Sequence, residues 1–387
     1  MRLLDAVLRK GLPLESALDG AARDLDRPDD RAFAHAIAAE ALRRLPDLDA
    51  LIDRATKKRL ADDAKARSAL RIALVQALAL DTPHHAAIST VLPLVDGGPR
   101  KLVHGVFSTV MREKWTLPEV PSLPGAVAER WRETWGDVVV AAAARLIAEP
   151  PPIDLSGDPP RDSGGVSLMP GHLRLPRGTD VAALAGYGEG SGRWWVQDVS
   201  ASIPARLLGD GDGRFALDLC AAPGGKTMQL AAAGWDVTAL DISESRLARL
   251  SDNLARTGLQ ARLVAADVMK WSPSDRVDAI LLDAPCTATG IFRRHPDVLH
   301  RVRPRAIAEL AEVQKAMLLR VAGWLKPGGT LIYSVCSLER PEGEHVAAAF
   351  LDARDDYVLE EERRILPGAH EEQGGADSFF IARFTRK

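Results

Sequence analysis

The chain has 387 residues, of which 46% are hydrophobic and 27% are charged, and 50 Lys and Arg against 53 Asp and Glu give a formal net charge of −3. This is the composition of an ordinary globular protein, and at roughly 100 to 200 residues per domain the length predicts two or three domains. The charge balance excludes a strongly basic protein that coats nucleic acid through bulk charge, although it permits a local basic patch.

Residues 1–140 are predicted to form an all-helical domain. The amphipathic stretches that carry this prediction are residues 31–45, 69–81 and 100–115. Asp29 and Asp30 are candidate caps for the first of these helices. No alternating pattern of useful strand length occurs in this part of the chain, so we expect no sheet here.

Residues 141–209 are predicted to form a linker and a small accessory segment, because 149–165 are rich in Pro, Gly and Asp. From 210 to 387, strand and helix patterns alternate, which is typical of an α/β domain with a doubly wound, Rossmann-like parallel sheet. The expected strands are 214–220, 235–241, 261–267, 277–286, 330–337, 357–365 and 379–386. The expected helices begin near 226, cover 243–257 with Ser243 as the cap, and cover about 304–325.

Cysteine usage and the apolar segments indicate the compartment. The three cysteines include no CxxC pair, which excludes a zinc ribbon, and we expect no metal. Their odd number argues against a disulfide framework. Asp5 interrupts the first apolar stretch, and Arg145 interrupts the run of residues 138–148. Neither segment therefore predicts a signal peptide or a membrane span, and we expect a cytoplasmic protein with reduced thiols.

The turn after the first expected strand and the acids at strand ends predict a nucleoside ligand. A phosphate-binding loop needs Gly five residues before Gly225, where Cys220 stands, and the GxGxxG fingerprint is also missing. An acid at the end of the second strand can accept ribose hydroxyls. The acids at the four strand ends are Asp218, Asp241, Asp267 and Asp283. They favour a nucleoside without a pyrophosphate, and S-adenosylmethionine fits that description.

All three cysteines stand at the ends of expected strands, where ligands bind in such sheets. Cys286 occupies the place where methyltransferases acting on an exocyclic amine typically carry an aromatic ring, which indicates a carbon target. C5 of cytosine or uracil becomes nucleophilic only after a thiolate adds to C6, and a base must then remove the C5 proton. Cys336, Asp283 and Cys286 could supply the nucleophile, the acid and the group for elimination. The target base must leave its stack, so the substrate should be single-stranded or flipped out.

A basic cluster follows Cys286 directly. Its members are Arg293, Arg294, Arg301, Arg303 and Arg305, against the single acid Asp297. We interpret this cluster as a patch that contacts RNA phosphates.

Three ordered motifs give the chain a family resemblance. LDLCAAPGGKT, LDAPCTATGIFRRHPD and YSVCS resemble the RNA cytosine-C5 methyltransferases of the NOL1/NOP2/Sun family. WWVQDVSA resembles a segment upstream of their cofactor loop, and we expect its Trp194 and Trp195 to pack rather than to stack on a base. Residues 69–91 and 100–114 are similar to the NusB-like RNA-binding domain. This combination resembles bacterial enzymes that methylate C5 of a cytosine in 16S rRNA.

The resemblance implies a role for each matching residue. Cys336 corresponds to the family's nucleophile, and Cys286 corresponds to the thiol of elimination and product release. The implied S-adenosylmethionine pocket consists of Cys220, Ala221, Ala222, Pro223, Gly224, Gly225, Lys226, Asp241, Asp267 and Asp283. Val335 stands where the family usually has Thr, and Thr287 stands where Ser is common, but both thiols are in place.

The resemblance also implies the partners. We expect a monomer that acts on 16S rRNA, either naked or in an early assembly particle. Because DNA cytosine-C5 methyltransferases carry their nucleophile in a Pro-Cys motif, Cys286 could instead be the attacker, although the presence of Cys336 favours the RNA assignment. The same residues would also suit a cytosine-C5 methyltransferase of tRNA or of another rRNA site, a non-catalytic RNA-binding factor, or a nucleotide-dependent oxidoreductase. The missing GxGxxG disfavours the oxidoreductase.

Overall fold

The computed structural model describes residues 1–188 and 192–387, which form two compact units. The helical unit comprises Met1–Glu149 and Phe292–Val302, and the sheet unit comprises Pro150–Ile291 and Arg303–Lys387. The segment expected at 141–209 is therefore not a unit of its own, because the two compact units divide it between them. Residues 189–191 of that segment lie outside the described residues. No helix within the described ranges is long and apolar enough to cross a membrane.

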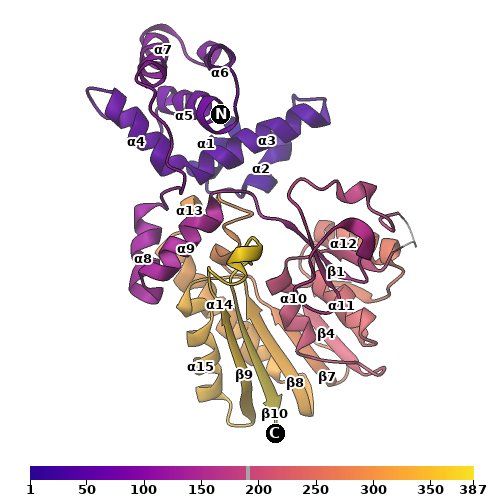
Figure 1. Ribbon diagram of the computed structural model, residues 1–387. Helices are drawn as coiled ribbons and strands as arrows, with labels where there is room; N and C mark the ends of the chain where they lie inside the picture. Colours follow the sequence, from indigo (N-terminus) through magenta and orange to yellow (C-terminus); the bar gives the residue numbers. More distant parts are fainter. Residues whose placement is uncertain (189–191) are drawn as a thin grey trace. The chain divides into compact units, whose positions relative to one another are not determined.

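The helical unit is built from α-helices, of which α13 comes from a later part of the chain than the others (Figure 1). They are α1 (Arg2–Leu8), α2 (Leu14–Ala21), α3 (Pro28–Arg43), α4 (Leu45–Ala55), α5 (Lys65–Ala79), α6 (His84–Val91), α7 (Gly97–Arg112), α8 (Gly125–Trp135), α9 (Asp137–Ile147) and α13 (Val298–Arg301). The expected helices at 31–45, 69–81 and 100–115 correspond to α3, α5 and α7. α5 packs against α3, α4, α6 and α7, and its Leu70 and Leu74 are fully buried. The helical spacing of apolar residues thus identified the central helix of this unit.

The start of α3 differs from the sequence expectation. Arg27 takes the N-cap position and Pro28 is the first helical residue, so Asp29 and Asp30 lie in the first turn. Pro is favoured at this first position because it has no N–H to satisfy. The two acids therefore interact with the positive end of the helix dipole instead of capping the first N–H groups.

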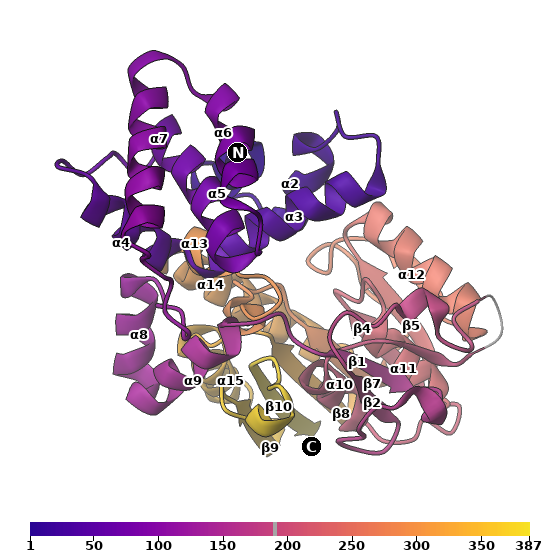
Figure 2. The same ribbon diagram turned by 45° about the horizontal axis from the view of Figure 1, so that its top comes forward.

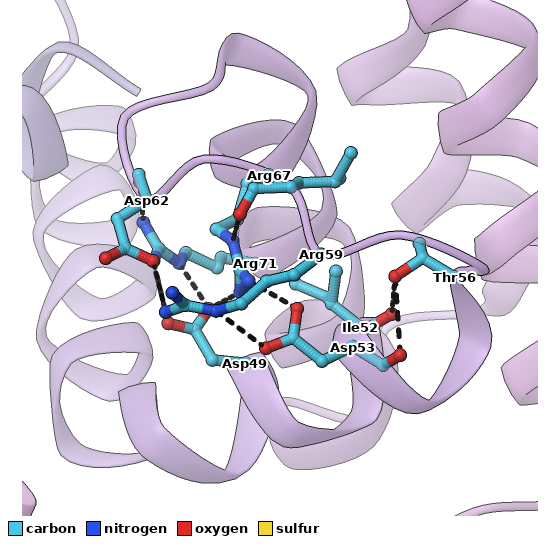
Figure 3. Close-up of polar contacts among 9 residues, drawn as sticks. Asp49, Ile52, Asp53, Thr56, Arg59, Asp62, Arg67 and Arg71 are labelled. Carbon is cyan, nitrogen blue, oxygen red and sulfur yellow. Dashed lines mark hydrogen bonds and ion pairs between the residues drawn. The ribbon is translucent and has the colours of Figure 1, made fainter.

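Two buried arginines join α4 to α5 (Figure 3). Arg67 and Arg71 are one turn apart on α5 and are 0% and 3% exposed. Arg71 donates to both carboxylate oxygens of Asp49, at 2.7 and 2.8 Å. Arg67 donates to Asp53 and lies 3.1 Å from Asp49. Because a buried guanidinium needs a charged partner, these ion pairs fix the register of the two helices.

The Asp49→Ala substitution should destabilise the helical unit. It removes the shared partner of Arg67 and Arg71, and breaking a buried ion pair costs about 3 kcal/mol. Asp62→Ala is the matched control, because Asp62 pairs with Arg59 at 2.7 Å and both side chains are mostly exposed. We expect the control to change the free energy of unfolding by less than about 1 kcal/mol. Denaturant unfolding followed by circular dichroism measures both, and equal effects would contradict the structural role of Asp49.

The sheet unit contains two sheets. The smaller is antiparallel with the order β2-β1-β3, from β1 (Ile153–Gly157), β2 (His172–Leu175) and β3 (Trp194–Val196). The larger has the order β6-β5-β4-β7-β8-β10-β9. Its strands are β4 (Phe215–Leu219), β5 (Asp236–Asp241), β6 (Arg262–Ala265), β7 (Val277–Asp283), β8 (Leu325–Val335), β9 (Tyr357–Ile365) and β10 (Phe379–Arg386). The larger sheet therefore contains all seven expected strands.

The large sheet is mixed rather than entirely parallel. The five strands from β4 to β8 are parallel to their neighbours in the sheet, whereas β10 runs antiparallel to both β8 and β9. The helices of this unit are α10 (Val199–Arg206), α11 (Gly225–Ala232), α12 (Glu244–Thr257), α14 (Pro304–Ala322) and α15 (Glu344–Ala353). α14 and α15 cover one face, while α10, α11 and α12 cover the other (Figure 2). This confirms the expected doubly wound, Rossmann-like architecture.

Candidate active site

The pairing of β7 with β8 brings two of the three thiols together. Asp283 ends β7 and is paired with Ser334 near the end of β8. Cys286 follows β7 by three residues, and Cys336 directly follows β8. Their Sγ atoms lie 3.5 Å apart, within hydrogen-bonding distance for sulfur. The sequence-predicted nucleophile and release thiol therefore meet at the carboxyl edge of the parallel strands.

The environment of Cys286 keeps this thiol protonated. The hydrogen bond to Cys336, followed by burial and the charges of Cys336 and Glu342, raises the pKa of Cys286 well above its ordinary value. A protonated Cys286 can donate to the sulfur of Cys336. Two adjacent thiols cannot both ionise easily, so a proton shared by this pair stays on one of them.

Lys226 and Asp283 form an ion pair beside the thiols. The ammonium lies 2.8 Å from one carboxylate oxygen of Asp283, and the other oxygen accepts the Ser334 hydroxyl at 2.8 Å. Burial lowers the pKa of Lys226, but the charge and the hydrogen bond of Asp283 together with the charge of Asp218 outweigh burial, so the net pKa is raised. Cys336 also contributes to this rise, which places the ammonium within electrostatic reach of that sulfur. The site thus combines a cation, an acid and two thiols.

The turn from Cys220 to Lys226 connects β4 to α11. The conformation at Gly224 has φ +107°, and a Cβ there would collide with the Leu250 side chain, so glycine is required. Asp241, at the end of β5, accepts the backbone N–H groups of Ala222 at 3.1 Å and Ser243 at 3.0 Å. Burial raises the pKa of Cys220 to about 12, with smaller contributions from Asp283 and other acids. Cys220 is therefore an unreactive thiol that belongs to the turn.

The four expected acids occupy different places. Asp241 and Asp283 end their strands, and Asp267 lies two residues beyond β6, where it accepts the N–H of Met269 at 2.8 Å. Asp218 instead lies inside β4 with 0% exposure, and its carboxylate accepts the Thr227 hydroxyl at 2.6 Å. Asp218 therefore anchors the first turn of α11 through Thr227.

The arginine cluster is not one exposed patch. Arg293 is 1% exposed in the helical unit, which corrects its assignment as a phosphate contact. Arg301 donates to Asp297 at 2.9 Å, and Arg305 pairs with Glu309 at 2.7 Å while remaining 90% exposed. Arg294 and Arg303 are exposed. An RNA-contacting role for the exposed members stays a prediction.

Trp194 and Trp195 are 1% and 2% exposed, which confirms that they pack inside the protein. Trp195 Nε1 donates to Gln197 at 2.7 Å, and Gln197 in turn donates to Gln229 of α11 at 2.8 Å. The WWVQDVSA segment is thus hydrogen-bonded to α11, the helix that follows the turn from Cys220 to Lys226.

Sequence reasoning missed Glu342, a 0% exposed acid that contacts residues next to both thiols. Its sequence context, Glu339 to Glu344, contains three acids at the start of α15, which begins at Glu344. Acids are common in such a position because of the helix dipole, so no local pattern distinguishes the buried one.

Comparisons with known proteins agree with this geometry. A crystal structure titled PH0851 matches 100% of this chain and 98% of its own with a TM-score of 0.75 at 22% identity, which shows the shared fold. The family model described as 16S rRNA methyltransferase RsmB/F matches residues 205–385, and the NusB family model matches residues 1–112. The sheet unit therefore has the Rossmann-like methyltransferase fold, and it follows a NusB domain.

Two curated relatives extend the match to the whole chain. Both carry the name Ribosomal RNA small subunit methyltransferase B. The protein from Xylella fastidiosa is 34% identical over 100% of this chain and 96% of its own, and that from Klebsiella pneumoniae is 31% identical over 99% and 96%. The chain belongs to the RsmB/F family of 16S rRNA methyltransferases, which confirms the resemblance inferred from its motifs.

The Asp218→Asn substitution should change stability in a pH-dependent way. Burial raises the pKa of Asp218 to about 7, from an ordinary value of 3.8, against the opposing effects of Thr227 and Lys226. The unfolded chain loses this proton near pH 4 and the folded chain near pH 7, so wild-type stability falls as pH rises between these values. Asn does not ionise, so the variant should gain about 2 kcal/mol relative to wild type between pH 5 and pH 8.

Denaturant unfolding at both pH values tests this prediction, with Asp236→Asn, at an exposed position, as the control. A difference between Asp218→Asn and wild type that is the same at pH 5 and pH 8 would show that Asp218 is not protonated in the folded protein.

Proposed function

We propose that this protein methylates C5 of a cytosine in 16S rRNA, with S-adenosylmethionine as methyl donor and Cys336 as a covalent nucleophile. The observation that carries the proposal is the pair of thiols 3.5 Å apart at the ends of β7 and β8. Methylation of an exocyclic amine needs no thiol, whereas methylation of C5 needs a sulfur nucleophile for C6. The names of the relatives support small-subunit rRNA as the substrate.

The residues of the turn and of β5 fit S-adenosylmethionine. The Asp241 carboxylate accepts two backbone N–H groups and lies 3.4 Å from the Arg246 guanidinium, and with roughly four acceptor positions it keeps capacity for a ribose hydroxyl. The glycine turn allows the backbone to approach a ligand closely. When bound, S-adenosylmethionine supplies an electrophilic methyl group. The pocket residues we assign are Cys220, Ala221, Ala222, Pro223, Gly224, Gly225, Lys226, Asp241, Asp267 and Asp283.

Cys336 starts the reaction on the cytosine. Its thiolate forms an S–C6 bond, and the electron pair of the C5–C6 double bond moves into the ring, so that C5 becomes nucleophilic. Lys226 and Asp283, paired at 2.8 Å, lie beside this centre, where they can stabilise the charge that develops on the cytosine ring.

Release from the enzyme requires the C5 proton to leave and the S–C6 bond to break. A Cys286 thiolate takes the C5 proton, the electron pair of the C5–H bond restores the C5–C6 double bond, and the electron pair of the S–C6 bond leaves on Cys336 as a thiolate. Cys286 is assigned to this elimination because its sulfur lies against that of Cys336. Its raised pKa means that the thiol can hold a proton next to the departing sulfur.

The Cys286→Ala variant should accumulate a covalent protein–RNA adduct, because attack by Cys336 continues while release slows. The Cys336→Ala variant and the double variant should form no adduct. A denaturing gel of each protein with 16S rRNA and S-adenosylmethionine measures the shifted band. Adduct from Cys336→Ala and none from Cys286→Ala would assign the nucleophile to Cys286, as in the DNA enzymes.

Deletion of the gene should remove 5-methylcytosine from one position of small-subunit rRNA. Mapping of methylated cytosines in total RNA tests this, with wild-type protein restoring the mark and Cys336→Ala failing to restore it. An unchanged rRNA together with a lost mark in tRNA would instead assign the enzyme to tRNA.

A further inference from the structure

Glu342 is a buried carboxylate to which the proposed reaction assigns no step. It ends the 3-10 helix Arg340–Glu342, between β8 and α15. Burial raises the pKa of Glu342, and hydrogen bonds from Ser337 and Thr287 oppose that rise. A buried acid is costly unless donors surround it, so its donors are informative about its role.

Four donors from three segments converge on this carboxylate. One oxygen accepts the Thr287 N–H at 2.8 Å and Gln314 Nε2 at 3.1 Å. The other accepts the hydroxyls of Thr287 and Ser337, both at 2.5 Å. An ionised carboxylate has about four acceptor positions, so all of them are filled. Thr287 follows Cys286 and Ser337 follows Cys336, so a single side chain joins the residues next to the two thiols.

The segments that contain Cys286 and Cys336 differ in the contacts that hold them apart from those with Glu342. Cys336 follows a strand whose last residue, Val335, is paired with Phe380 of β10, and the carbonyl of Ser337 accepts a hydrogen bond from Arg364. These anchors do not involve Glu342.

The Cys286 segment is held at its two ends by the N–H groups of Ala284 and Gly290, which donate to Ser334 and Cys336 carbonyls at 3.0 Å. Between them, the N–H and the hydroxyl of Thr287 both donate to Glu342. Gln314 adds a bond of 2.9 Å to the Pro285 carbonyl and is itself bonded to Glu342. Loss of the carboxylate would therefore release the Cys286 segment more than the Cys336 segment.

We propose that Glu342 is a positioning residue that holds the Cys286 thiol against Cys336 and thereby controls the release step. The catalytic part of this inference rests on the proposed function, whereas the positioning itself concerns only the distance between two thiols. Two readouts therefore separate the two claims.

The first readout is disulfide formation between the two thiols, which needs neither RNA nor S-adenosylmethionine. With glutathione disulfide as oxidant, Cys286 and Cys336 lose two protons and two electrons and form one S–S bond, while the oxidant becomes two molecules of glutathione. Mass spectrometry of the linked peptides measures the rate. The wild type should react readily because its sulfurs lie 3.5 Å apart.

Three substitutions at Glu342 test the positioning. Glu342→Ala removes every acceptor, and Glu342→Asp keeps the charge but shortens the side chain by one methylene, so both should slow disulfide formation by about 10-fold or more. Glu342→Gln keeps the length and one acceptor oxygen, and the hydroxyls of Thr287 and Ser337 can rotate to accept from its amide, so it should retain most of the rate. Glu342→Asp keeps the test decisive if Glu342→Ala does not fold.

Asp278→Asn is the matched control. Its carboxylate also accepts a backbone N–H, from Phe215 at 3.0 Å, and pairs with Lys326 at 2.8 Å, but it lies at the start of β7, away from the thiols. The control should form the disulfide at the wild-type rate. Wild-type rates in Glu342→Ala and Glu342→Asp, both folded by circular dichroism, would overturn the positioning role.

The second readout is the lifetime of the covalent RNA adduct. Glu342→Asp should form the adduct at close to the wild-type rate but release it about 10-fold more slowly, because Cys286 is misplaced while Cys336 is not. Slower adduct formation with unchanged release would overturn the assignment to the release step. If the Glu342→Ala and Glu342→Asp variants form the disulfide slowly but the wild-type protein methylates no RNA, the positioning role is supported and the proposed function is refuted.

Discussion

The parallel pairing of β7 with β8 is the constraint on which the rest of the site depends. Asp283 is paired with Ser334, and the Ser334 hydroxyl donates to the Asp283 carboxylate at 2.8 Å. A shift of one residue in this register would turn every side chain of one strand to the opposite face of the sheet. Leu282 and Tyr333, neighbours of this pair, are fully buried in the core, which makes such a shift costly. The apolar core therefore fixes where Cys286 and Cys336 emerge.

Three acids of the sheet unit, of which Asp218 and Glu342 are fully buried, are each compensated in a different way. Burial raises the pKa of Asp218 to about 7, so a proton compensates this acid below neutral pH. Lys226 neutralises Asp283, and four hydrogen-bond donors surround Glu342. Like charges at close range repel strongly in a poorly solvated interior. This division lets the sheet unit keep three acids with little direct repulsion between them.

Local patterns predicted the strands of the larger sheet well, but they did not predict the smaller sheet of β1, β2 and β3. Alternation identified β9 and β10 with their observed bounds, and Ser243 caps α12 as expected, since its hydroxyl accepts the N–H of Arg246. The sequence also indicated the two thiols, because strand ends in a parallel sheet converge. What it did not predict depends on distant residues. Arg293 is buried although its charge suggested an exposed side chain. The hydrogen-bond donors to Glu342 come from residues up to 55 positions away in the sequence.

The central claim is that a thiol activates C5 of cytosine, and the fate of the C5 hydrogen tests it most directly. Small-subunit rRNA carrying tritium at C5 of cytosine is incubated with the protein and S-adenosylmethionine, and tritium release and methyl incorporation are both counted. We expect one tritium to be released to water for each methyl group transferred, with neither event in Cys336→Ala. Methyl incorporation without tritium release would place the methyl group on another atom and contradict the activation of C5.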